Sequence, residues 1–149
     1  MAQYFFDTSA IVKYYHREAG TAAVESIFGE TGRNIRISSL GFLEIQSAFA
    51  MKVRSGVLSR DGAGIQRGRL LVDVAAGDIE VYKITDLHFA SAQRLIGQYG
   101  FDSRLRTLDA LQLAIAIDLA EQSLLDHFVV ADSTLASVAS AVGLNVINP

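Results

Sequence analysis

Two aspartates each directly follow the end of a predicted strand, a position where parallel sheets commonly carry ligand-binding or catalytic residues. Asp7 directly follows the apolar run QYFF and Asp132 follows the run FVVA, each just before a segment with helical character. Because the carboxyl ends of parallel strands meet at one edge of a sheet, we expect the two carboxylates to lie close together. Taken alone, each aspartate also suits the N-terminal cap of the helix that follows it.

Glu44 is the third candidate acid and lies inside the helical segment SLGFLEIQSAFAMKV. Helical spacing places it on a stripe that we predict to face the core, made of Leu40, Glu44, Ser47, Ala48 and Met51. A buried, unpaired carboxylate is costly or becomes neutral, so this position favours a functional role. The alternative is that Glu44 lies at the edge of the stripe and reaches water.

Asp109 is the fourth candidate, near the start of the segment LDALQLAIAIDLA, which is apolar enough to be largely buried. Asp118 belongs to the same segment, but nine helical positions turn it to the opposite face, so the two acids cannot share a site. The structural alternative for Asp109 is a first-turn position that favours negative charge, with an ion pair to Arg106 three residues earlier.

Four carboxylates at one crevice repel one another unless a cation holds them. Oxygen ligands without sulfur or histidine suit Mg²⁺ or Mn²⁺, which typically meet substrate phosphates. One such ion activates a water molecule, and a pair of ions can hold the attacking and the leaving oxygen. The three histidines, His16, His88 and His127, lie outside these segments, and we expect them at the surface. The pattern therefore indicates metal-dependent phosphoryl chemistry.

The composition excludes several other classes of protein. Of the 149 residues, 50% are hydrophobic and 19% charged, which excludes a disordered chain. The absence of cysteine excludes disulfide scaffolds, thiolate zinc sites and cysteine nucleophiles. No apolar run is long enough to span a bilayer, and an aspartate at position 7 argues against a signal peptide. We therefore expect a cytoplasmic protein.

Short strands alternate with longer helical segments, and this order predicts an α/β fold with a mostly parallel sheet of about five strands. The predicted strands are Gln3 to Phe6, Ile35 to Ser38, Ile79 to Ile84, Phe128 to Ala131 and Asn145 to Ile147. The predicted helices are Ser9 to Glu18, Thr21 to Phe28, Leu40 to Arg54, Ser59 to Ala76, Leu87 to Tyr99, Leu108 to Ala120 and Thr134 to Val142.

The segments FDTSAIVKYY, LRTLDALQLA and FVVADSTLASVA, with the intervening helix that carries Glu44, resemble the PIN domain. More closely, they resemble the VapC-type ribonuclease toxins of toxin–antitoxin pairs. The resemblance covers almost the whole chain. It implies a single three-layer α/β/α domain over residues 1–149, acting as a Mg²⁺- or Mn²⁺-dependent endoribonuclease on single-stranded RNA. It also implies a homodimer that a cognate antitoxin protein inhibits.

Carried over residue by residue, the resemblance assigns the catalytic set to Asp7, Glu44, Asp109 and Asp132. Asp7 and Asp109 are the expected metal ligands, Glu44 and Asp132 are further candidate ligands, and Thr8 and Ser9 are expected to support the site by hydrogen bonding. Two departures stand out: Gln112 replaces a histidine common after the DAL motif, and the ADST segment holds one aspartate rather than two. The second departure leaves the number of metal ions open.

Three other interpretations compete with a nuclease. An inactive PIN-like module for dimerisation or binding would have no reason to keep all four acids. A phosphoacceptor receiver domain would place an acidic pair after the first strand, where Thr8 follows Asp7 instead. A phosphatase of the haloacid dehalogenase type would show Asp-x-Asp, and Ser9 replaces the second acid.

Residues 33–71 could attract RNA although the whole chain carries a net charge of −3. This segment holds seven basic residues and two acidic ones, and Arg54 and Arg60 flank the turn at Gly56. We expect these two arginines to bind RNA; the alternative is an ordinary solvated helical face. The helices between Leu40 and Ala76 also carry more apolar surface than one sheet layer needs, which predicts the homodimer interface there.

Overall fold

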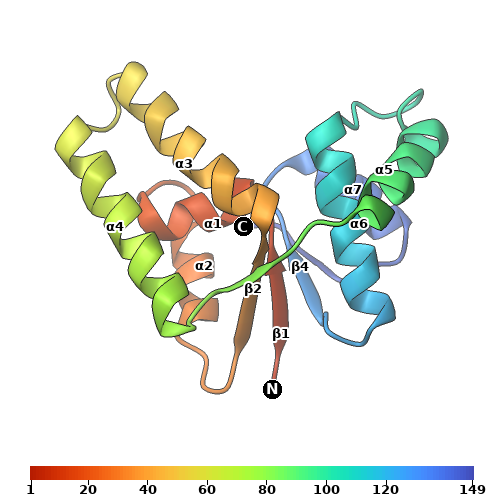
Figure 1. Ribbon diagram of the computed structural model, residues 1–149, viewed down its shortest axis with the longest axis horizontal. Helices are drawn as coiled ribbons and strands as arrows, with labels where there is room; N and C mark the ends of the chain where they lie inside the picture. Colours follow the sequence, from red (N-terminus) through yellow and green to blue (C-terminus); the bar gives the residue numbers. More distant parts are fainter.

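The computed structural model describes residues 1–149, and its centre is a five-stranded sheet in the order β3-β2-β1-β4-β5 (Figure 1). All four strand pairs are parallel. The strands are β1 (Gln3–Phe6), β2 (Asn34–Ser38), β3 (Glu80–Tyr82), β4 (His127–Val129) and β5 (Val146–Ile147). The central strand β1 has Phe5 opposite Arg36 of β2 and Phe128 of β4.

Seven helices cover the two faces of the sheet. They are α1 (Thr8–Tyr15), α2 (Thr21–Phe28), α3 (Ser39–Arg54), α4 (Arg60–Ala76), α5 (Asp86–Tyr99), α6 (Thr107–Glu121) and α7 (Ser133–Ala141). Helices α1 to α4 pack on one face and α5 to α7 on the other (Figure 1). The alternation of β1 builds both cores, because Tyr4 and Phe6 point into the first and Phe5 into the second.

The predicted fold class is confirmed, and every predicted helix and strand is present with ends that agree within three residues. The boundaries follow local chemistry. Asp7, Ser38, Ser59 and Asp132 each cap the following helix through a side-chain oxygen, and α4 ends at Gly77, whose φ of 81° suits glycine. No helix combines the length and apolarity that crossing a membrane requires.

One orientation was predicted wrongly. The buried residues of α3 are Gly41, Ile45 and Phe49, one position away from the predicted stripe. Glu44 is half-buried beside that face, and Met51, from the predicted stripe, is exposed. Leu43 is also exposed, so apolar side chains lie on both sides of α3 and periodicity alone selected the wrong face.

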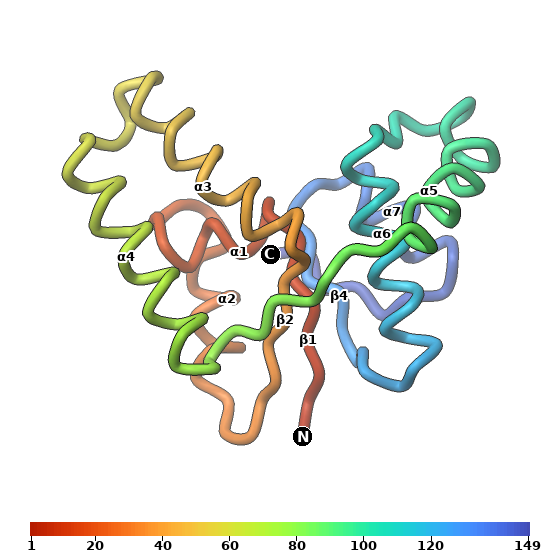
Figure 2. The backbone as a smooth tube through the Cα atoms, viewed as in Figure 1, coloured from red at the N-terminus to blue at the C-terminus, as the bar shows by residue number.

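The chain trace shows how the helices frame the carboxyl ends of the strands (Figure 2). The α3–α4 hairpin rises on one side of this edge, and α5 with the start of α6 rises on the other. Asp7 follows β1 at this edge, and Glu44 lies in the second turn of α3. The fold therefore brings the loop after β1, which carries Asp7, and the start of α3, which carries Glu44, to the same edge of the sheet.

Candidate active site

Asp7 is a buried carboxylate without a basic partner. The residue is 7% exposed, and its carboxylate accepts hydrogen bonds from the backbone N–H and the hydroxyl of Ser9. Burial raises the pKa of Asp7 and the negative charge of Asp109 adds to this, although the Ser9 hydrogen bonds act in the opposite direction. Capping and a functional role do not exclude each other here, because Asp7 caps α1 and still has no ion-pair partner.

Glu44 shares this environment. The hydroxyl of Thr8 donates to Glu44 Oε1 at 3.1 Å, and Nε2 of Gln112 lies 3.4 Å from the same atom. Burial raises the pKa of Glu44, and the charges of Asp7 and Asp109 raise it further. Asp7, Glu44 and Asp109 are therefore near enough to disfavour one another's ionisation.

Asp109 and Asp132 meet through a basic residue. The backbone N–H and Nε of Arg106 both donate to Asp109 Oδ2 at 3.2 Å, and a terminal nitrogen of Arg106 lies 3.9 Å from Asp132 Oδ2. Asp132 also caps α7, accepting from the N–H of Leu135 at 2.8 Å. The Arg106–Asp109 ion pair that the sequence suggested is thus present, and Arg106 also lies near a second acid, Asp132.

Ser9 links the ends of the two central strands. Its hydroxyl donates to Asp7 and accepts from the backbone N–H groups of Ala131 at 3.0 Å and Asp132 at 3.2 Å. The loop after β4 is thereby held against the loop after β1. With the Thr8–Glu44 hydrogen bond and the Arg106 contacts to Asp109 and Asp132, these links bring all four predicted acids to one edge of the sheet.

Gln112 is the residue whose part in this site the sequence did not reveal. It is fully buried on α6, accepts a hydrogen bond from Ser38 at 2.7 Å and directs its amide nitrogen at Glu44. The sequence marked it only as a departure from the family pattern. Its contact with a residue 68 positions away depends on the tertiary fold, which brings Gln112 of α6 and Glu44 of α3 together and which no local pattern encodes.

The donors at this edge fit Mg²⁺ or Mn²⁺ in kind, because all are carboxylate or hydroxyl oxygens. Asp7 and Glu44, which lack basic partners, supply the negative charge such an ion needs. As the side chains stand, however, no three acidic or histidine side chains converge closely enough to hold an ion. Asp109 is instead engaged by Arg106.

His88 corrects the expectation of surface histidines. It is 4% exposed, its Nε2 lies 2.9 Å from Asp118 Oδ2, and its Nδ1 accepts from the N–H of Thr85. Tyr82 and Gln122 also donate to Asp118. Burial alone would raise the pKa of Asp118, but the hydrogen bonds from His88, Gln122 and Tyr82 together lower it. As predicted, Asp118 belongs to a different site from Asp109.

The basic residues of segment 33–71 do not form one patch. Arg36 is buried on β2 and bonds to Glu80, Gln3 and a backbone carbonyl, while Lys52 pairs with Glu18. Arg54 and Arg60 are exposed at the tip of the α3–α4 hairpin. At 1.5 Å per residue, Arg54 lies about 15 Å along α3 from Glu44. These two arginines could thus contact only RNA that extends along α3.

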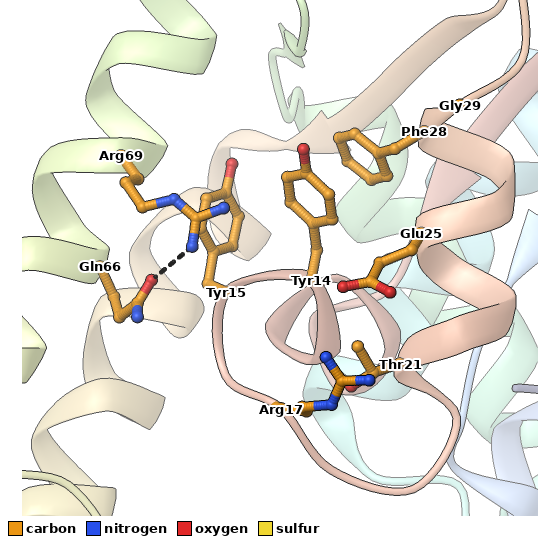
Figure 3. Close-up of a pocket in the computed structure, with 9 residues that line it drawn as sticks. All are labelled: Tyr14, Tyr15, Arg17, Thr21, Glu25, Phe28, Gly29, Gln66 and Arg69. Carbon is orange, nitrogen blue, oxygen red and sulfur yellow. Dashed lines mark hydrogen bonds between the residues drawn. The ribbon is translucent and has the colours of Figure 1, made fainter.

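A pocket of about 560 Å³ lies between α1, α2 and α4, away from the acids (Figure 3). Tyr14 and Phe28 stack with ring centroids 3.7 Å apart, and the guanidinium of Arg69 lies over Tyr14 and Tyr15. Arg17 and Glu25 line the opposite part of the pocket. Aromatic faces and two guanidinium groups line this pocket. It therefore differs in chemistry from the sheet edge that carries Asp7, Glu44, Asp109 and Asp132, which we call the acidic edge.

The acids follow the chain in the order Asp7 after β1, Glu44 on α3, Asp109 on α6 and Asp132 after β4. The sequence profile of the PIN domain matches residues 4–140. The chain belongs to the PIN domain family. No curated protein sequence matches it closely enough to count as a relative.

Several solved structures share its fold at low sequence identity. VapC20 of Mycobacterium tuberculosis, a toxin that cleaves the sarcin–ricin loop, superposes with a TM-score of 0.69 at 15% identity, over 98% of this chain and 99% of its own. VapBC2 of Rickettsia felis, bound to a promoter DNA fragment, gives 0.64 at 16% identity, over 98% of each chain. FitAcB of Neisseria gonorrhoeae gives 0.64 at 16% identity, over 98% and 97%.

Proposed function

We propose that this PIN domain is a metal-dependent endoribonuclease of the VapC type that hydrolyses phosphodiester bonds of single-stranded RNA in the cytoplasm. The observation that carries the proposal is the pair of carboxyl groups without ion-pair partners, Asp7 and Glu44, whose pKa values are raised by burial and by neighbouring acids. Such a concentration of negative charge is costly for a protein that only binds or dimerises. It is the arrangement expected where a divalent cation acts.

The residues at the edge divide into two groups in this proposal. Asp7 and Asp109 would hold a Mg²⁺ or Mn²⁺ ion, with Glu44 and Asp132 as further ligands, directly or through water. Bound there, such an ion would activate a water molecule and offset charge on the phosphate. Ser9 orients Asp7, and Thr8 and Gln112 orient Glu44, through the hydrogen bonds described above. Arg54 and Arg60 would hold RNA that leaves the site along α3.

A cognate antitoxin is the proposed protein partner, because structural neighbours include VapBC2 and FitAcB. The pocket of Figure 3 is the candidate docking site: Arg17 and Arg69 suit acidic side chains, and the Tyr14–Phe28 stack suits an apolar or aromatic one. Arg69→Glu is expected to abolish co-purification with the antitoxin while leaving RNA cleavage intact. Retained co-purification would place the antitoxin elsewhere.

A homodimer through α3 and α4 is also part of the proposal. Several large apolar side chains of these helices and their turn are exposed: Leu43, Met51, Val57, Ile65, Leu71 and Val72. Exposed apolar surface of this kind typically marks an interface. Sedimentation of the chain as a monomer at tens of micromolar would contradict the dimer.

The proposed activity is tested by cleavage of a labelled single-stranded RNA with Mg²⁺, with Mn²⁺ and with chelator. We expect cleavage only with a divalent ion, and we expect Asp7→Asn to reduce it by orders of magnitude while the fold is retained. Asp78→Asn makes the same chemical change at an exposed acid far from the site and serves as the control. Cleavage that persists in chelator would overturn metal dependence; no cleavage with any ion would favour an inactive module.

A further inference from the structure

Arg106 is the only basic side chain that forms an ion pair with any of the four acids. It lies at the residue before α6, where its backbone N–H and its Nε atom both donate to Oδ2 of Asp109. The same guanidinium reaches towards Asp132, the cap of α7. A single exposed side chain therefore forms both ion pairs that these acids make in this structure.

The two partners differ in their freedom to move. The side chain of Asp109 is 13% exposed and that of Arg106 is 76% exposed. The Asp109 carboxylate is also fixed by the backbone N–H of Arg106, a contact that does not need the guanidinium. Because exposed ion pairs contribute little stability, the guanidinium can leave this pair at small cost while Asp109 stays in place.

Space for the displaced group exists beside the pair. A pocket of about 320 Å³ is lined entirely by polar and charged side chains: Arg104, Arg106, Asp109, Asp132 and Thr134. The guanidinium can turn into this pocket and remain solvated there. Oδ2 of Asp109, which now accepts two N–H groups of Arg106, would then lose one of them.

We propose that Arg106 is an exchangeable counter-ion of the acidic edge, which engages Asp109 and Asp132 until a divalent cation displaces it from Asp109. The inference rests on the proposed metal-dependent function and adds a competitor within the chain itself. It also accounts for the present geometry, in which three acids do not converge on one point. Arg106 is thus a positioning residue that lowers the affinity of the resting site for metal.

The test measures Mn²⁺ affinity by electron paramagnetic resonance or calorimetry on the whole chain without RNA, at pH 7 and fixed ionic strength. Arg106→Ala is expected to bind Mn²⁺ about two- to fivefold more tightly, the range that loss of one exposed charge interaction allows. Arg106→Gln keeps a polar side chain without the charge and is expected to behave in the same way. Arg104→Ala removes an equal charge from the same pocket but from no ion pair, and is expected to match wild type.

Each outcome bears on one hypothesis. Equal or weaker Mn²⁺ binding by Arg106→Ala overturns the counter-ion proposal, as does equal tightening in Arg104→Ala, which would show a general charge effect. Tightening in Arg106→Ala without tightening in Arg106→Gln also overturns it, because bulk rather than charge would then matter. If wild type and all variants bind no Mn²⁺ and RNA cleavage ignores chelator, the failure lies in the proposed metal-dependent function instead.

Discussion

Asp109 and Asp118 belong to the same helix, nine residues apart, and their environments are opposite. Asp118 accepts hydrogen bonds from His88, Tyr82 and Gln122, and together these lower its pKa against the effect of burial. Asp109 has donors from Arg106 alone, and its charge raises the pKa values of Asp7 and Glu44, which have no basic partner. A carboxylate with a complete set of donors stabilises the fold, whereas acids that oppose one another indicate a site that needs a cation.

The largest expected difference between the acidic edge and the Asp118 site is in stabilisation by a divalent metal ion. At a free-ion concentration of one hundred times its dissociation constant, Mn²⁺ should stabilise the wild type by about 2.7 kcal/mol, or about 5–10 °C in melting temperature. Asp118→Asn should retain this increase, and Asp7→Asn should lose most of it. Thermal unfolding with Mn²⁺ and with chelator measures the difference; equal increases in both variants would contradict the assignment of the site.

In the metal-free protein, loss of the Asp118 carboxylate should destabilise the fold more than loss of the Asp7 carboxylate. Asp118→Ala leaves the buried His88 and the hydroxyl of Tyr82 without their acceptor, which should cost about 1–3 kcal/mol. Asp7→Asn keeps an acceptor for Ser9 and removes an unbalanced buried charge, so it should be neutral or stabilising. Urea unfolding in chelator measures both, and an Asp7→Asn variant less stable than Asp118→Ala would reverse the comparison.

The two regions should also respond to pH with opposite sign. Asp7 and Glu44 have raised pKa values in the folded state, so the stability they contribute is present below their unfolded values of about 4 and is lost as the pH rises through the folded ones. Asp118 has a lowered pKa, so its contribution is present above about 4 and is lost as the pH falls through the folded value.

Unfolding free energies from pH 3 to 8 in chelator test this difference. Asp7→Asn should reduce the decline in stability as the pH rises above about 4, and Asp118→Asn should reduce the decline below about pH 4. Parallel pH profiles for the two variants would show that the carboxylates do not differ in the way described.

The smallest effect concerns Arg54 and Arg60, which lie outside both regions. Each phosphate contact on a single strand contributes about −0.7 to the slope of log affinity against log salt. Alanine at either position should flatten the slope by about this amount and leave the response to metal unchanged. Arg17→Ala, an exposed arginine beside α1, is the control. If the alanine variants bind RNA with unchanged affinity and salt dependence, Arg54 and Arg60 do not contact RNA and the tip of the α3–α4 hairpin is an ordinary solvated surface.

Much of the fold was predictable because its signals are local. Strand-length apolar runs, helical periodicity and capping residues such as Asp7 and Ser59 fix where elements begin and end. Position along the chain also placed Asp7 and Asp132 at the same sheet edge, since parallel strands share it. The contacts of Gln112 with Glu44 and of His88 with Asp118 join different helices and were not predicted. The face of α3 was also missed, because apolar side chains such as Leu43 and Met51 are exposed on this helix and periodicity does not distinguish them from buried ones.

The most direct test of the account is the divalent-dependent RNA cleavage rate of Asp109→Asn beside that of Asp118→Asn. The two variants undergo the same chemical change in the same helix, so helix propensity and net charge are matched. Asp109→Asn should lose activity by orders of magnitude, and Asp118→Asn, assayed below its melting temperature, should stay within a few-fold of wild type. Equal losses in both variants, or cleavage that survives Asp109→Asn, would contradict the acidic edge as the catalytic site.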